Sequence, residues 1–219
     1  MGKMEKKNKK ALVCGASLLI AFVLCTVLVC LVDVQAIGPE GSSVGFGTLN
    51  GYVHDLTGVN MSLYVITDWL GLVPIGIAFG FAVLGLVQLI KRKSLLKVDR
   101  SILVLGGFYI VVMAVYILFE TVVINYRPTL IDGYLEASYP SSTTMLVMCV
   151  MPTAMMQLRD RIKNKAFIRC VMIAIAAFVA FMVIGRLVSG VHWVTDIIGG
   201  ALVSSGLVIT YATVSNIIK

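Results

Sequence analysis

The sharpest chemical pattern in the sequence is formed by Arg186, His192 and Asp196, with five residues between the first two and three between the last two. Side chains four residues apart share one face of a helix, so the Asp196 carboxylate can accept the hydrogen of one ring nitrogen of His192. The other ring nitrogen is then free to act as a nucleophile in covalent catalysis. Because a His-x-x-x-Asp pair is common on helices, this interpretation needs support from the rest of the chain.

The composition predicts that these residues lie in a membrane protein. Of the 219 residues, 59% are hydrophobic and only 13% are charged, against about 25% charged residues in soluble proteins. Apolar runs of about 20 residues match the hydrocarbon thickness of a bilayer. We therefore expect an all-α, six-transmembrane-helix bundle in a single domain, 1–219, with Pro152 kinking the fourth and shortest span. The predicted spans are 11–32, 63–90, 101–123, 143–158, 167–184 and 194–217.

The placement of the basic residues predicts the orientation. Lys and Arg cluster before the first span, after the second, after the fourth and at the chain end. The positive-inside rule makes all four segments cytoplasmic, which requires an even number of spans. Residues 1–10 are then a cytoplasmic basic tail, the first span a retained signal anchor, and both termini cytoplasmic at a plasma membrane. Segments 33–62, 124–142 and 186–193 face outward. The net charge of +7 thus indicates membrane topology and no nucleic-acid partner.

Arg127 and Arg186 are the two basic residues, of eighteen, that this sorting leaves on the outer side. Each lies beside the end of a span, where a cation without a partner is unfavourable. We expect an anionic ligand or a carboxylate near both, and the alternative is that they snorkel to the interface. Asp68 lies near the outer end of the second span and is a functional candidate because it is an acid within the membrane. Acids in such positions more often pair with a cation or cap a helix than take part in catalysis.

The chain resembles the family of type 2 phosphatidic acid phosphatases, which shares its fold with the vanadium haloperoxidases. That family carries three motifs in order: Lys, six residues, Arg-Pro; then Pro-Ser-Gly-His; then Ser-Arg, five residues, His, three residues, Asp. Their order, their outer location and the six-span layout all match, so the resemblance covers nearly the whole chain. The matching residues are Arg127 and Pro128, Pro140 and Ser141, and Arg186, His192 and Asp196.

The resemblance implies a role for each matching residue. His192 would attack phosphorus and become phosphohistidine, while Asp196 would hold its tautomer. Two arginines would clamp the phosphate oxygens, and a helix N-terminus would add donors. No cofactor is implied, and two histidines without an outer acidic cluster offer no metal site. The predicted substrate-binding residues are Arg127, Arg186, Pro140, Ser141 and Ser142.

Three positions depart from the family pattern. Glu120 replaces the lysine, Ser142-Thr143 replaces Gly-His, and Gly185 replaces the serine of the third motif. The histidine replaced by Thr143 protonates the leaving oxygen, and a threonine hydroxyl cannot supply a proton near neutral pH. Loss of a general acid lowers a rate by roughly 10² to 10⁴.

Two other residues are candidate replacement acids. Glu120 precedes Arg127 by seven residues, so both would share a helix face if the third span continued that far, and burial could tune the carboxyl. The alternative is that Glu120 is a structural partner of an arginine. His54 is on the same side, but a solvated loop histidine is the more common situation. We expect Asp132 and Glu136 to shape their loop.

The substitution at Thr143 affects substrates unequally. A monoester expels an alkoxide that needs the missing proton, whereas a diphosphate expels a phosphate that can leave unprotonated. We therefore expect a membrane lipid phosphohydrolase that favours lipid or polyprenyl diphosphates. The alternatives are a weakened relative that binds or moves phosphorylated lipids, and a small channel or transporter, which the chain resembles less because it lacks broken-helix symmetry. The oligomeric state stays open.

Overall fold

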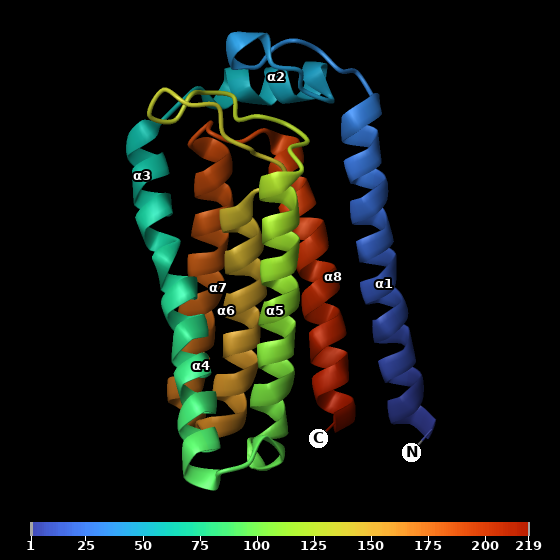
Figure 1. Ribbon diagram of the computed structural model, residues 1–219, viewed down its shortest axis with the longest axis vertical. Coiled ribbons are helices and arrows are strands. Elements are labelled where there is room, and N and C mark those ends of the chain that lie inside the picture. The colour runs from blue at the N-terminus through green and yellow to red at the C-terminus, as the bar shows by residue number, and fades with distance from the viewer. Residues whose placement is uncertain (1, 219) are drawn as a thin grey trace.

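The computed structural model describes residues 2–218, and the long segments are all helical (Figure 1). Long apolar stretches form helices because a helix satisfies its own backbone hydrogen bonds in lipid. The elements are α1 (Gly2–Leu31), η1 (Pro39–Gly41), α2 (Gly47–Thr57), α3 (Met61–Leu70), α4 (Leu72–Arg92), η2 (Leu95–Lys97), α5 (Arg100–Thr121), α6 (Ser142–Arg161), α7 (Lys165–Val188) and α8 (Val194–Ile218).

Within the described residues, five helical segments are long and apolar enough to cross a membrane: α1, α3 with α4, α5, α7 and α8. The sixth predicted span corresponds to α6, which has 20 residues but is less apolar. It packs against α4, α5, α7 and α8 and runs alongside them in Figure 1. A helix enclosed by others can carry Thr153 and Gln157, which are buried in protein. The multi-pass helical fold is therefore confirmed, and the count of six spans stays a prediction.

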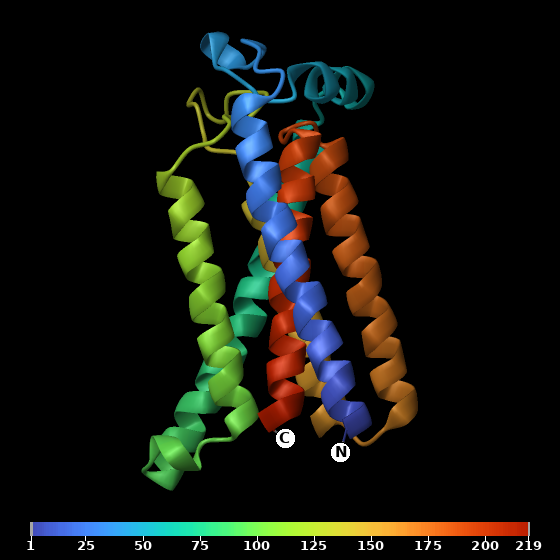
Figure 2. The same cartoon turned by 90° about the vertical axis from the view of Figure 1, so that its right-hand side faces the viewer.

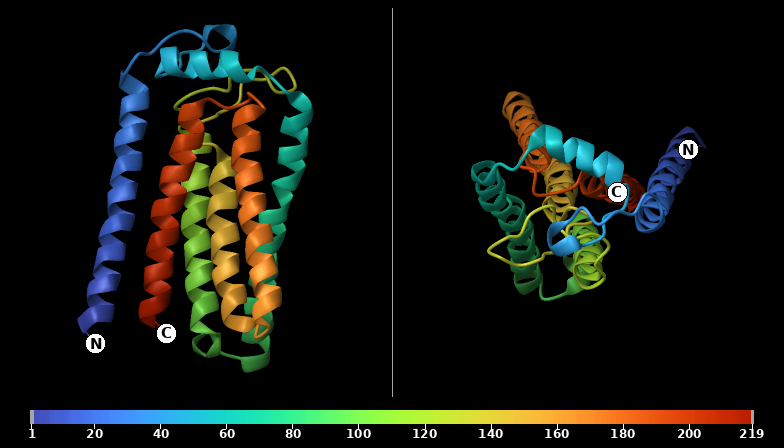
Figure 3. Two further views of the ribbon diagram at one scale, coloured as in Figure 1. Left: turned by 180° about the vertical axis from the view of Figure 1, so that it is seen from behind. Right: turned by 90° about the horizontal axis from the view of Figure 1, so that it is seen from above.

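The helices stand side by side, and the two ends of the described chain, the start of α1 and the end of α8, lie at the same end of the bundle (Figures 1 and 2). The turn from α4 to α5 and the turn from α6 to α7, where the basic residues cluster, lie at that end too. At the other end α2 lies across the bundle, beside the long loop between α5 and α6 (Figure 3). An even number of crossings accounts for this arrangement.

Helix α1 packs along α8 through a contact between small residues. A Cβ on Gly15 would lie 3.2 Å from the carbonyl oxygen of Gly206, and one on Gly206 would lie 3.1 Å from that of Gly15. Small residues let two helices approach closely in a membrane, where van der Waals packing drives association. Around this seam, side chains of α1, α5, α6 and α8 form the main core: Phe22, Val29, Leu105, Phe108, Met145, Cys149, Val203 and Tyr211.

Two helix boundaries differ from the prediction. The second predicted span is divided at Gly71 into α3 and α4. Pro74 follows within the first turn of α4, and a proline there cannot donate a hydrogen bond back into α3. The third predicted span ends at Thr121, and residues from 122 to 141 form a loop in which Tyr126 pairs with Ala137. The premise that Glu120 and Arg127 share one helix face is therefore wrong.

Candidate functional site

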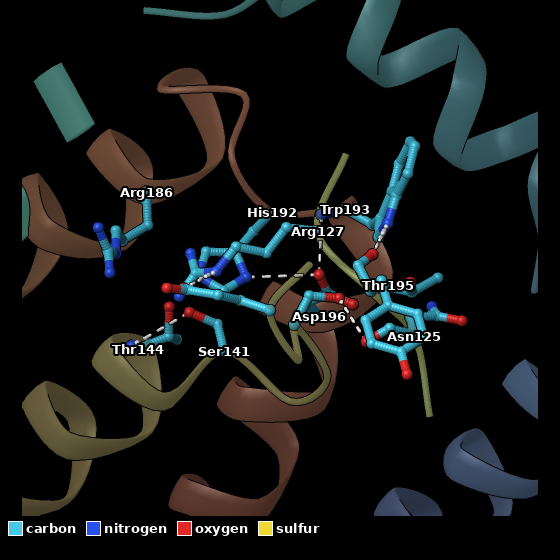
Figure 4. Close-up of polar contacts among 12 residues, drawn as sticks. Asn125, Arg127, Ser141, Thr144, Arg186, His192, Trp193, Thr195 and Asp196 are labelled. Carbon is cyan, nitrogen blue, oxygen red and sulfur yellow. Dashed lines mark hydrogen bonds and ion pairs between the residues drawn. The ribbon is translucent and has the colours of Figure 1, made fainter. Parts of the chain in front are cut away.

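The predicted site residues meet at the end of the bundle that carries α2. Arg127 comes from the loop before α6, Arg186 from the last turn of α7, and His192 and Asp196 from the entry into α8. Figure 4 shows these side chains around the start of α6. Arg127, Arg186, His192 and Asp196 are all less than a tenth exposed. Residues 127 and 196 are far apart in the chain, so only the tertiary fold assembles this cluster.

The His192–Asp196 pair has the geometry of a nucleophile and its orienting group. Asp196 lies in the first turn of α8, and its Oδ2 is 3.4 Å from Nδ1 of His192. The same oxygen accepts the backbone N–H of Trp193 at 2.9 Å. The backbone N–H of Ser141 donates to the carbonyl oxygen of Asp196 at 3.0 Å, which joins the start of α6 to the start of α8. The Trp193 amide thus holds the carboxylate directly, and the Ser141 amide holds the backbone that carries it.

Arg127 contacts the opposite edge of the imidazole. Its Nη1 lies 3.1 Å from Nε2 of His192. A guanidinium can only donate, so Nε2 presents its lone pair to Arg127 and the ring hydrogen belongs on Nδ1, facing Asp196. Glu136 supports the arginine: its carbonyl oxygen accepts the Arg127 backbone N–H at 3.0 Å, and its Oε2 lies 3.0 Å from Nε. Glu136 therefore does more than shape the loop.

Arg186 lies on the other side of the site and is almost fully buried. Its Nη2 donates to the Thr143 hydroxyl at 2.7 Å and lies 3.3 Å from Oδ1 of Asp68. Its Nη1 lies 3.5 Å from the Thr67 hydroxyl. The expectation of a carboxylate or anion beside each outer arginine is therefore met by Asp68 for Arg186 and by Glu136 for Arg127.

Tyr64 of α3 is a site residue that sequence reasoning missed. The guanidinium carbon of Arg186 lies 5.0 Å from its ring centroid, and that of Arg127 lies 5.9 Å away. A ring face attracts cations, so one tyrosine helps to hold two like charges near each other. Tyr64 and Asp68 are four residues apart on α3. That spacing was the available signal, but nothing in the sequence linked it to the arginines.

The electrostatic environment keeps His192 neutral. Burial lowers the pKa of His192 well below its usual value of 6.5, and the positive charges of Arg127 and Arg186 lower it further. A neutral imidazole with an unprotonated Nε2 is the form that can attack an electrophile. The arginines that would bind an anion thus also keep the nucleophile unprotonated.

The second predicted motif forms the N-terminus of α6. The Ser141 side chain is the N-cap and accepts the backbone N–H of Thr144 at 3.4 Å. Pro140 precedes it after a cis peptide bond. Ser142 and Thr143 are partly buried in the first turn of α6, where free backbone N–H groups and the helix dipole favour an anion. Ser141 is fully buried, so its hydroxyl acts as a cap in this structure.

Neither of the two candidate replacement acids forms a hydrogen bond or an ion pair with Arg127 or Arg186 in the described residues. Glu120 is exposed at the end of α5, and within residues 2–218 it forms no hydrogen bond or ion pair. His54 is not a solvated loop residue as expected: it lies in α2, and its ring centroid is 5.5 Å from that of Trp193.

Helix α2 fastens the loop that carries His192. Asn50 is fully buried and donates to the Thr195 hydroxyl at 3.0 Å and to the carbonyl oxygen of Gly45 at 2.7 Å. The Asn60 backbone N–H donates to the Ser189 carbonyl oxygen at 2.9 Å. The predicted outer segment 33–62 is therefore part of the support of the site.

No group of three or more His, Cys, Asp or Glu side chains able to hold a metal ion occurs among the described residues. The chemical groups that the site does offer are a nucleophilic imidazole, a carboxylate that orients it, two guanidinium groups and a helix N-terminus. Together they fit a tetrahedral oxyanion such as a phosphoryl group.

Comparisons with known proteins agree with this geometry. The model of the PAP2 superfamily matches residues 121–218, the segment that carries Arg127, the start of α6 and the His192–Asp196 pair. Among solved structures, the fold is similar to a transmembrane PAP2-type phosphatidylglycerolphosphate phosphatase from Bacillus subtilis, with a TM-score of 0.56 and 20% identity over 94% of this chain and 97% of that one. A comparison with curated proteins gave no significant match. Residues 121–218 thus match the PAP2 superfamily, and the fold of nearly the whole chain is similar to that of a membrane phosphatase of the PAP2 type.

Proposed function

We propose that the protein is a membrane lipid phosphohydrolase that works through a phosphohistidine intermediate. The observation that carries the proposal is the environment of Nε2 of His192, which is oriented by Asp196 from behind and faces the Arg127 guanidinium at 3.1 Å. A phosphoryl group bound between the two arginines would lie next to the Nε2 lone pair, which Arg127 must release as the attack begins.

The mechanism follows from the geometry in two steps. His192 Nε2 attacks phosphorus, the bond to the lipid oxygen breaks, and the imidazole gains positive charge that the Asp196 carboxylate stabilises. Arg127, Arg186 and the α6 N-terminus hold the three phosphoryl oxygens as their charge redistributes. Water then attacks phosphohistidine, which releases inorganic phosphate and restores the neutral ring.

We propose that lipid diphosphates, including polyprenyl diphosphates, are favoured over monoesters. Thr143 Oγ1 accepts a hydrogen bond from Arg186, and a threonine hydroxyl does not release a proton near neutral pH. A diphosphate expels a phosphate whose second pKa is about 6, so this leaving group departs without a proton. An alkoxide does not, which makes the monoester the slower substrate.

We propose that the site faces outward from a plasma membrane. The support is that the site lies at the end of the bundle opposite both termini and the clusters of basic residues (Figure 1). The positive-inside rule assigns the basic end to the cytoplasm. The substrate is then a phosphorylated lipid of the outer leaflet, with its head group at the end of the helices and its chain in the bilayer.

The test is phosphate release from a panel of lipid monophosphates and diphosphates by the purified protein in detergent micelles, with His192→Ala as the control. Activity that depends on His192, and a radiolabelled phosphohistidine trapped by acid-free quenching, support the hydrolase. Binding of the lipids without a trapped intermediate would instead support a relative that binds or moves phosphorylated lipids. Equal turnover of a lipid diphosphate and its monophosphate would remove the proposed preference.

A further inference from the structure

The first step of hydrolysis needs a proton donor on a particular side of the phosphoryl group. In-line attack by His192 places the departing lipid oxygen on the face of phosphorus remote from Nε2. Because Arg127 lies against Nε2 of His192, we place this remote face on the Arg186 side. The groups on that side are Arg186, Thr143, Thr67, Asp68 and the ring of Tyr64. Of these, the carboxyl group of Asp68 is of the type that most commonly serves as a general acid.

Asp68 also borders the space that the lipid would occupy. A cavity of about 420 Å³ between α3–α4 and α5–α6 is lined by Asp68, Ser142 and Thr143 at one end and by apolar side chains such as Leu72, Ile75 and Met113 beyond them. The cavity thus joins the polar site to an apolar space between helices, and the carboxyl lies where the two meet. The oxygen that links a phosphoryl group to a lipid chain must lie at that boundary.

The other acidic residues near the site are placed for different roles. Asp196 is fully buried behind His192. Glu136 contacts Arg127, on the nucleophile side. Glu120 is exposed at the end of α5 and has no bond to either arginine. The Asp68 side chain is 57% exposed, so it can contact a ligand in the cavity and still reach Arg186.

We propose that Asp68 is a catalytic residue: the general acid that protonates the leaving oxygen of lipid phosphate monoesters, in place of the hydroxyl of Thr143. This assignment rests on the proposed phosphohydrolase function. The carboxyl group lies 3.3 Å from Arg186 and borders the cavity, so it is within reach of both the bound phosphoryl group and the lipid oxygen.

The proton and the bonds balance over the two steps. As the N–P bond to His192 forms and the P–O bond to the lipid breaks, the Asp68 carboxyl gives its proton to the departing oxygen, which becomes a lipid alcohol. The resulting carboxylate is next to Arg186. In the second step the carboxylate removes a proton from the water that attacks phosphohistidine, and inorganic phosphate leaves. Diphosphates need no such proton, so the residual monoester activity is what depends on Asp68.

The experiment measures kcat of the wild-type chain and of Asp68→Asn on three substrates with the same alkyl chain. The substrates are dodecyl phosphate, a dodecyl-substituted nitrophenyl phosphate, and dodecyl diphosphate. We expect Asp68→Asn to lower kcat for the alkyl ester by roughly 10²-fold or more, and to lower kcat for the aryl ester and the diphosphate by less than about tenfold. The aryl and diphosphate leaving groups are stable anions, so they depart without the acid. Exposed Asp55 of α2 provides the charge-matched control Asp55→Asn, for which all three rates should equal those of the wild type.

The ratio of the rates separates this role from a structural one. If Asp68 only positions Arg186, Asp68→Asn and Thr67→Val should slow all three substrates by equal factors, and that result would overturn the inference. Unchanged alkyl ester hydrolysis by Asp68→Asn would overturn it as well. Because each ratio is measured on one preparation, partial unfolding cancels. If the wild-type chain hydrolyses none of the substrates, the proposed function fails before the role of Asp68 is reached.

Discussion

Replacing Asp196 with asparagine is expected to reduce turnover by roughly three orders of magnitude without unfolding the protein. The asparagine side chain has the same shape, and its oxygen can still accept the Trp193 backbone N–H that Asp196 accepts at 2.9 Å. What is lost is the negative charge, which lies 3.4 Å from Nδ1 of His192 and is fully buried. The charge matters most when the imidazole becomes positive on forming phosphohistidine.

The magnitude follows from that distance. Two unit charges 3.4 Å apart interact by about 5 kcal/mol at an effective dielectric constant of about 20. At 1.36 kcal/mol for each tenfold change in rate, this corresponds to roughly 10³- to 10⁴-fold in kcat. The removal of an orienting carboxylate from a histidine also permits the wrong tautomer, which acts in the same direction.

The assay is phosphate release under saturating lipid diphosphate, together with the thermal unfolding temperature of each variant in detergent. Ser204→Ala is a matched control, because Ser204 is also buried on α8 but its hydroxyl donates to the carbonyl oxygens of Gly200 and Met145. We expect this control to keep kcat within about twofold, since distant sites act independently. An Asp196→Asn variant that folds normally and keeps more than a tenth of wild-type turnover would refute the reasoning.

Three other predictions follow from the site and its supports. Because burial and two arginines hold the pKa of His192 below 6.5, kcat/KM should stay level as the pH falls from about 8 to 6.5 and decline only at lower pH, whereas Arg127→Gln removes one of these causes and should move the decline to higher pH. The same shift means that the unfolded chain takes up a proton first, so the free energy of unfolding should decrease below about pH 6.5. A bell-shaped activity profile centred above pH 8 would contradict the first statement, and a free energy of unfolding that does not fall below pH 6.5 would contradict the second. Gly190→Ala should lower stability by about 2 kcal/mol or more, because φ is +67° and the new Cβ would lie 1.7 Å from the carbonyl oxygen of Gly58, whereas Gly133→Ala, with φ of +84° and open space around it, should lose only about 1 kcal/mol; equal thermal shifts would argue against the contact. Glu120→Gln should change kcat for any lipid phosphate by less than about tenfold, and a larger loss in the phosphate-release assay would return Glu120 to the site.

Most of the helices could be predicted from the linear sequence because the properties that make a segment helical in a membrane are local. Length and apolarity of a run decide whether a helix is stable in lipid, and they predict α1, α5, α7 and α8 closely. The length and apolarity of a segment say little about where its helix ends. The division at Gly71 and the end of α5 at Thr121 depend on neighbouring segments. The boundary at Thr121 is also why the predicted pairing of Glu120 with Arg127 on one helix face does not occur.

The candidate site, too, could be predicted in part. The pairing of His192 with Asp196 follows from their spacing, since four residues is about one helical turn. The two arginines could be identified because a cation at the outer end of a span needs an anion. Which anion each arginine meets was beyond the sequence. Asp68 and Glu136 reach Arg186 and Arg127, and Tyr64 lies against both, because helix packing brings α3 and the loop before α6 to the entry of α8. Contacts between segments far apart in the chain arise from how whole surfaces fit, and no local pattern of residues encodes that fit.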